Sequence, residues 1–213
     1  MRRGLWTALL LLPFSHAPAQ NGATVTFTFS NPALQPARYS LLVHEDGTGH
    51  YHAEPGSAPV QDGSTPQPFD RDIKLDDGLR TQLFALARKN RFFTKECDSK
   101  RNNIAFTGDK TLSYAGPEGT GSCTFNYPRD AKVEEAANSL IAVATTLEEG
   151  RKLELLFQHD KLGLDAEVEL LAGEQANGRA LDLENIAPVL RAISTSDEVM
   201  HHTRIRADLL LGH

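Results

Sequence analysis

Apolar and polar residues alternate along much of the first 130 residues. In the stretch ATVTFTF at 23–29, one valine and two phenylalanines alternate with threonines. A period of two is typical of a strand that buries one face. Further segments with this alternation are predicted as strands, the last three forming an antiparallel meander: 38–44, 48–53, 69–75, 103–108, 110–116 and 123–127.

The apolar pattern also decides the loop of the hairpin formed by 38–44 and 48–53. The apolar residues of the two strands share a face only if opposed residue numbers sum to an even number. A three-residue loop, 45–47, satisfies this condition, with Gly47 at the left-handed position of a bulged turn.

Apolar residues at steps of three and four predict helices elsewhere. One helix is predicted to begin at Asp77 with Asp76 as its N-cap. The longest pattern, 132–147, is predicted to end at Gly150 as a C-cap. Four shorter helices are predicted to follow: 151–158, 165–172, 186–193, and a last one capped by 196–198 that ends near Leu211.

These elements predict an α+β fold. An antiparallel sheet, or meander, with one packed helix would be followed by a C-terminal helical layer. We expect a signal peptide at 1–19, a β-rich α+β domain at 20–128 and a helical region at 129–213.

The N-terminus, MRRGLWTALLLLPFSHAPAQ, has the three parts of a secretory signal peptide. Two arginines precede the apolar run 5–14, and Ala17-Pro18-Ala19 supplies small residues for cleavage after Ala19. As a helix the run would span about 15 Å, half of the hydrocarbon layer, so a membrane anchor is the weaker interpretation. We therefore expect a periplasmic or secreted protein without stable membrane insertion after cleavage.

The chain carries 22 basic and 28 acidic residues, for a formal net charge of −6. An acidic surface repels phosphate backbones, and the sequence has no stripe of lysine and arginine with interleaved aromatic residues. We expect no nucleic-acid partner.

Cys97 and Cys123 are the two cysteines of the chain. In an exported protein an even number of cysteines predicts a disulfide, worth roughly 3–4 kcal/mol in the chain-entropy model. The alternative is a catalytic thiol. It is disfavoured because Cys123 begins an apparent strand, whereas a thiolate nucleophile needs a histidine base and a positive field.

The stretch VHEDGTGHYH at 43–52 holds three of the eight histidines. With the three-residue loop, His44, His50 and His52 lie opposite the buried face, and the two on one strand are about 7 Å apart. Zinc accepts three histidines and an open position for water, which would support hydrolysis. The alternative is a solvated hairpin face that needs no cofactor. The sequence identifies no carboxylate that would support the histidines as ligands, although Glu45 is near.

The sequence lacks the motifs of several common enzyme classes: G-x-S-x-G, H-E-x-x-H, S-x-x-K, and G-x-G-x-x-G after a strand. The adjacent acids Glu134-Glu135 and Glu148-Glu149 are interpreted as solvated helix surfaces. Neighbours on a helix diverge by about 100°, and acid–base catalysis needs a facing pair. No catalytic residue is predicted.

The span 39–150 resembles a class of exported bacterial domains of unknown function. Four segments carry the resemblance: Tyr39-Ser-Leu-Leu-Val43, Asp46-Gly-Thr-Gly-His-Tyr51, Leu83-Phe-Ala-Leu-Ala87 before Phe92-Phe93, and Lys110-Thr-Leu-Ser-Tyr114. The resemblance implies a hairpin, a helix and a β-meander in an exported protein. It implies no chemistry.

The segment 187–193, Val199 and the segment 204–210 are together similar to a single HEAT-type helical repeat, which implies a protein-binding surface. The favoured alternative is a helical layer that covers the meander. The leading hypothesis for the function is a non-enzymatic protein-interaction module of the bacterial envelope that binds another envelope or secreted protein. The second is a zinc-binding protein or zinc-dependent hydrolase that uses the three histidines of the hairpin.

Overall fold

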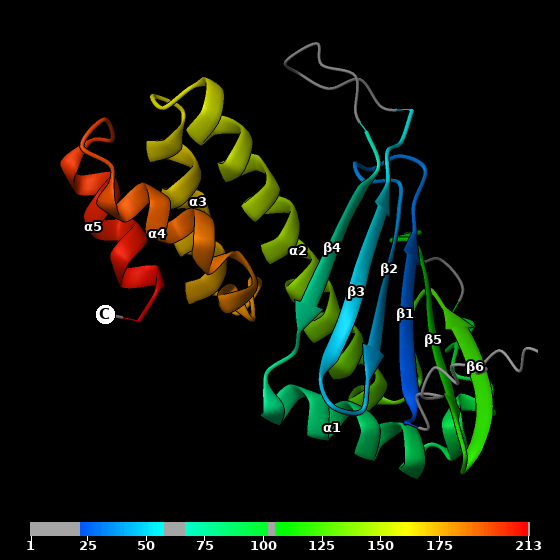
Figure 1. Ribbon diagram of the computed structural model, residues 1–213. Coiled ribbons are helices and arrows are strands. Elements are labelled where there is room, and N and C mark those ends of the chain that lie inside the picture. Colours follow the sequence, from blue (N-terminus) through cyan, green and yellow to red (C-terminus); the bar gives the residue numbers. More distant parts are fainter. Residues whose placement is uncertain (1–21, 58–66, 102–104, 213) are drawn as a thin grey trace, which may run out of the picture.

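Six of the seven alternating segments contribute to one six-stranded antiparallel sheet, in the order β4-β3-β2-β1-β5-β6 (Figure 1). The computed structural model describes residues 22–57, 67–101 and 105–212. The predicted leader, 1–19, lies outside these residues. The strands are β1 Thr24–Ser30, β2 Arg38–His44, β3 Thr48–Glu54, β4 Phe69–Lys74, β5 Asp109–Gly116 and β6 Gly119–Phe125.

Helices make up most of the remaining described residues, which confirms the α+β class. They are α1 Asp77–Lys89, α2 Ala131–His159, α3 Leu164–Ala176, α4 Ala187–Thr195 and α5 His201–Leu210, with short 3-10 turns η1 Arg91–Phe93 and η2 Leu183–Ile186. The predicted N-cap is confirmed, because Asp76 Oδ1 accepts hydrogen bonds from the backbone of Gly78 and Leu79 at 2.8 and 3.2 Å.

The β2–β3 hairpin has the predicted three-residue loop. Leu42 lies opposite His50, and Val43 opposite Gly49, so opposed numbers sum to an even value. Gly47 has a φ of 87°, in the left-handed region that favours glycine. Both Leu41 and Tyr51 are consequently fully buried on the same face.

The predicted strand at 103–108 is wrong for its described part, since 105–108 is not a strand; residues 102–104 lie outside the description. The reason is the sheet order. β5 pairs with β1 on one side and with β6 on the other, so no edge of β5 is free. The ammonium of Lys110 instead ties this segment down by donating to Thr107 Oγ1, Gly108 O and Asn126 O at 3.0–3.2 Å.

Both α1 and the first half of α2 cover one face of the sheet, so a second helix joins the single packed helix that was predicted (Figure 1). Aromatic and aliphatic side chains of all six strands meet Leu83 and Phe84 of α1 and Leu140 and Leu147 of α2 there. The other face carries mostly hydroxyl, imidazole and carboxylate side chains. The sheet is therefore one layer of a two-layer structure, with a polar outer face.

The helix α2 does not end at Gly150. It continues to His159 and is 29 residues long in all, so the C-cap and the separate helix at 151–158 were wrong predictions. Glycine is needed there for another reason: a Cβ at position 150 would lie 2.2 Å from Ile186 Cγ2. Beyond Gly150, Leu153 packs into a second apolar cluster with residues of α3, α4 and α5. Of the helices in the described ranges, α2 is thus the one that contributes to both clusters.

The helical layer is attached to the sheet through α2 and also through the short turn η2. The amide side chain of Asn185 accepts from the backbone N–H of Lys74 at 2.8 Å and donates to its carbonyl at 3.1 Å. In addition, Thr146 Oγ1 donates to Leu181 O at 2.7 Å. These bonds hold the turn before α4 against β4 and α2.

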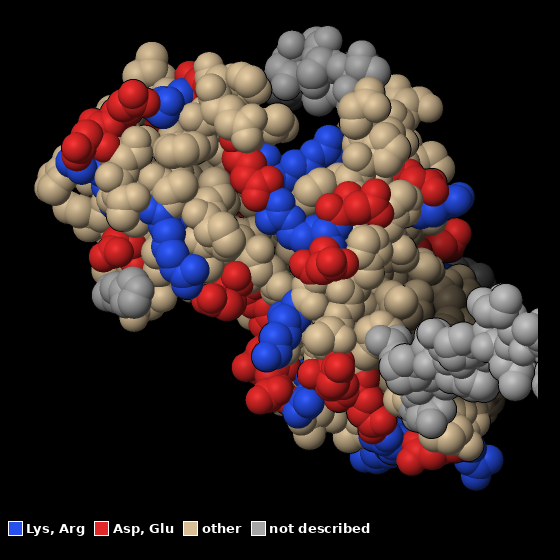
Figure 2. Space-filling model, in the orientation of Figure 1, with Lys and Arg blue, Asp and Glu red and all other residues tan. Residues whose placement is uncertain are grey.

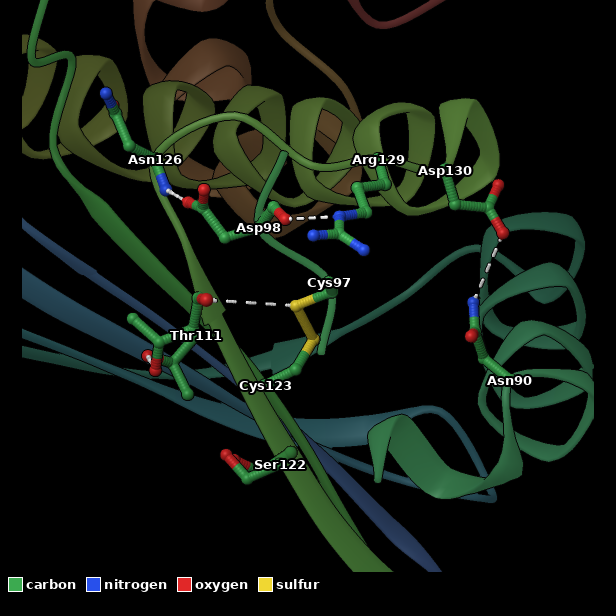
Figure 3. Close-up of a disulfide and its surroundings, with 11 residues drawn as sticks. Asn90, Cys97, Asp98, Thr111, Ser122, Cys123, Asn126, Arg129 and Asp130 are labelled. Atoms are coloured by element: carbon green, nitrogen blue, oxygen red, sulfur yellow. Dashed lines mark hydrogen bonds between the residues drawn. A yellow bond between two sulfur atoms is a disulfide. The ribbon is translucent and has the colours of Figure 1, made fainter. Parts of the chain in front are cut away.

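Cys97 and Cys123 form the predicted disulfide (Figure 3). It joins the segment after η1 to strand β6. Beside it, Asp98 Oδ2 accepts from the backbone of Asn126 at 2.7 Å, and its carbonyl accepts from Arg129 Nε at 2.7 Å. The cross-link therefore fixes a loop at the point where the chain leaves the sheet for α2. Among the described residues, no helix combines the length and apolar character needed to cross a membrane.

The close approach at Gly150 can be tested with a matched pair of glycines. We expect Gly150→Ala to lower the free energy of unfolding by about 1–3 kcal/mol, because the new methyl group must displace Ile186. Gly173, inside α3, has no atom within 4 Å of an added Cβ. Gly173→Ala should therefore raise stability by up to about 1 kcal/mol through helix propensity. Urea denaturation followed by circular dichroism measures both; equal effects would contradict the packing argument.

Candidate functional site

Two of the three predicted metal ligands lie together on the open face of the sheet. His50 and His52 of β3 oppose Asp72 and Asp70 of β4; we call these four residues the His–Asp ladder. One oxygen, Asp70 Oδ1, lies 3.1 Å from His50 Nε2 and 2.7 Å from His52 Nδ1. Asp72 Oδ1 lies 2.9 Å from His50 Nδ1.

The ladder favours a protonated His50. Both ring nitrogens face carboxylate oxygens, and only the imidazolium form can donate from both. Hydrogen bonds to Asp72 and then to Asp70 accordingly raise the pKa of His50 above its usual 6.5. Bonds from His52 and His50 lower the pKa of Asp70.

The third predicted ligand, His44, lies elsewhere on the same face. It opposes Thr24 of β1 and follows Val43 at the end of β2. Its neighbour in sequence, Glu45, pairs with Arg88 of α1 instead of with a histidine. Within 22–57, 67–101 and 105–212, no group of three or more histidine, cysteine, aspartate or glutamate residues is placed to hold a metal ion.

The rest of the open face is lined with hydroxyl groups. Thr111 and Thr124 approach to 2.8 Å across β5 and β6, and Ser113 and Ser122 to 2.9 Å. The threonines of β1 continue this surface toward the His–Asp ladder. The hydroxyl groups can donate and accept hydrogen bonds, and the His–Asp ladder on β3 and β4 adds positive and negative charge. Figure 2 shows acidic and basic side chains interspersed over the visible side of the molecule.

A second polar cluster joins α2 to the inner side of β3 and β4. Tyr51 donates to Glu148 Oε1 at 2.8 Å. Arg71 Nη2 donates to both oxygens of Glu154 at 2.7 Å and stacks 5.2 Å above the ring of Phe69. Burial raises the pKa of Glu148, so its interpretation as a solvated acid is wrong.

The adjacent Glu149 is also not a solvated acid. It points to the other side of α2, where it faces Glu167 of α3. Desolvation by burial, followed by interaction with Glu167, raises the pKa of Glu149. By contrast Glu134 and Glu135 are exposed, as predicted. No sequence pattern marked Glu149, because its partner is 18 residues away on another helix.

Most of the exposed large apolar side chains among the described residues belong to the helical layer. Of the eight large hydrophobic residues that are exposed among the described residues, six belong to this layer: Leu155, Leu162, Leu170, Met200, Ile205 and Leu209. On α5, Ile205 and Leu209 are one helical turn apart and are 49% and 63% exposed. They form a short apolar stripe on the last helix.

The charge state of the His–Asp ladder can be measured by imidazole NMR. Asp72 contacts His50 alone within the ladder, so Asp72→Asn should lower the pKa of His50. Asp109→Asn, an exposed change on β5, serves as the control and should leave it unchanged. Because folding raises this pKa, the stability that His50 contributes is complete below pH 6.5 and is lost as pH rises through the folded pKa. An unchanged titration in Asp72→Asn would contradict the ladder.

The chain matches no protein-family model, and comparison with curated proteins finds no relative. The function therefore has to be argued from the chain's own surfaces.

Proposed function

We propose that this chain is an exported, non-enzymatic protein-interaction module of the bacterial envelope, which binds another envelope or secreted protein through its helical layer. The observation that carries the proposal is the apolar stripe of Ile205 and Leu209 on α5, in a layer that holds six of the eight exposed large hydrophobic residues among those described. Large apolar side chains exposed next to each other on a protein surface are typical of binding sites.

The stripe on α5 has the properties of a prepared contact surface. Thr203 Oγ1 and Arg206 Nη1 donate to Asp165 Oδ1 of α3 at 2.8 and 3.2 Å, which fixes the rotation of α5. Ile205 and Leu209 are then held outward without needing to be ordered on binding. A surface ordered in advance loses less conformational entropy when a partner arrives.

Export is supported by two separate features. The leader pattern at 1–19 precedes the first strand. The disulfide between Cys97 and Cys123 is stable in an oxidising compartment and is rare in the cytosol of most bacteria.

The binding surface can be tested by photo-crosslinking in cells. A photoreactive residue at Ile205 or Leu209 should give a discrete adduct in the envelope fraction. Leu34 lies outside the helical layer and is 46% exposed, so it is a matched control that should give none. Ile205→Asp should abolish the adduct captured from a photoreactive residue at Leu209 while leaving the thermal midpoint nearly unchanged. Equal labelling from Leu34 and Leu209 would contradict the proposal.

Zinc binding by His44, His50 and His52 is the second candidate function. It is supported by the hairpin register, which puts all three on the open face. Untagged protein should then contain one equivalent of zinc, and His50→Ala should lose it. Substoichiometric metal that is unchanged in His50→Ala would remove this candidate. Zinc binds an unprotonated imidazole nitrogen, and the neighbouring carboxylates raise the pKa of His50, so acidic pH should weaken zinc binding.

A further inference from the structure

Two glutamates face each other between the first two helices of the helical layer. Glu149 of α2 lies within hydrogen-bonding reach of Glu167 of α3, which is only 6% exposed. Glu167 Oε2 lies 2.5 Å from the ammonium of Lys152. The oxygens Glu149 Oε2 and Glu167 Oε1 are buried and have no hydrogen-bond partner. Each carboxyl group thus keeps one oxygen that no described side chain or backbone group satisfies.

Two ionised carboxylates cannot satisfy each other. Both accept hydrogen bonds and neither donates, and their like charges repel more strongly where water is excluded. A protonated carboxyl group carries no charge and has one O–H donor. One proton shared between Glu149 and Glu167 would therefore remove the repulsion and give both groups a strong acid–carboxylate hydrogen bond.

We propose that Glu149 and Glu167 form a proton-binding site that holds the α2–α3 hairpin closed, and that loss of the proton loosens this hairpin. On release, the O–H bond of Glu149 breaks, its electron pair stays on the carboxylate and the proton passes to solvent. Two negative charges then lie between the helices. The apolar cluster that joins the same two helices includes Leu153 of α2 and Leu164, Val168 and Leu171 of α3.

The surrounding charges do not take the place of the proton. Lys152 is the cation that contacts the pair, and it offsets one of the two charges. Glu174 of α3 acts on Glu149 but is itself paired with Arg179 at 2.7 Å. On η2 and α4, which also pack on α2, the charges are Glu184 and Arg191, and they pair with each other at 3.2 Å.

The direction of the pH dependence follows from the burial of the pair. Burial, and then hydrogen bonding to Glu167, raises the pKa of Glu149 from 4.5 to about 8. The folded chain therefore binds this proton more tightly than the unfolded chain. The stability that the proton contributes is complete below about pH 4.5 and is lost as pH rises through about 8.

The full chain, labelled with carbon-13 at the glutamate carboxyl groups, tests the site directly by NMR titration between pH 5 and 10. We expect one carboxyl signal to titrate near pH 8 in the wild type, and to be missing in Glu149→Gln. Glu134→Gln, a change at an exposed acid of the same helix, should keep it. The thermal midpoint should fall between pH 6 and 9 in the wild type and in Glu134→Gln, and should fall much less in Glu149→Gln.

Two results would overturn the proposal. One is a wild-type titration in which every glutamate has its midpoint below pH 6. The other is an equally steep fall of the thermal midpoint in Glu149→Gln. If Glu149→Gln does not fold, Glu167→Gln replaces it: removing the partner should move the high-pH signal to lower pH, and an unmoved signal would show that it does not arise from this pair.

Discussion

The contact between Gly150 and Ile186 sets the relation between the two halves of the chain. Because α2 passes through both apolar clusters without a break, the sheet and the helical layer share one rigid element. A side chain at position 150 would push the turn before α4 away from α2. That turn also carries Asn185, whose amide holds the end of β4. One missing Cβ therefore allows both attachments of the helical layer to form together.

Local periodicity was sufficient to predict most of the sheet and the first helix. The three-residue length of the 45–47 loop followed from the need to put the apolar residues of both strands on one face, which is a short-range constraint. The course of α2 was not predictable in this way. Gly150 suits a helix C-cap when the sequence is taken alone, and its actual role depends on Ile186, which lies on a later turn. The pairing of β1 with β5 is likewise long-range, and it leaves no place beside β5 for the strand expected to include 105–108.

The polar sites show the same difference between local features, which the sequence predicts, and long-range contacts, which it does not. Hairpin parity predicted the face on which His50 and His52 lie, but their partner Asp70 comes from the next strand, beyond a loop. The acids Glu148 and Glu149 show why neighbours in sequence are poor guides to a site. Their divergence around the helix, which argued against a joint role, sends one to Tyr51 in the sheet and the other to Glu167 in the helical layer.

The two hydrogen bonds between the Asn185 amide and the backbone of Lys74 also have a consequence for self-association. β4 is an outer strand of the sheet, and the backbone groups of such a strand can template pairing with another chain. Here the amide of Asn185 occupies the N–H and the carbonyl of Lys74. An incoming strand would therefore have to displace Asn185 before it could pair with this end of β4.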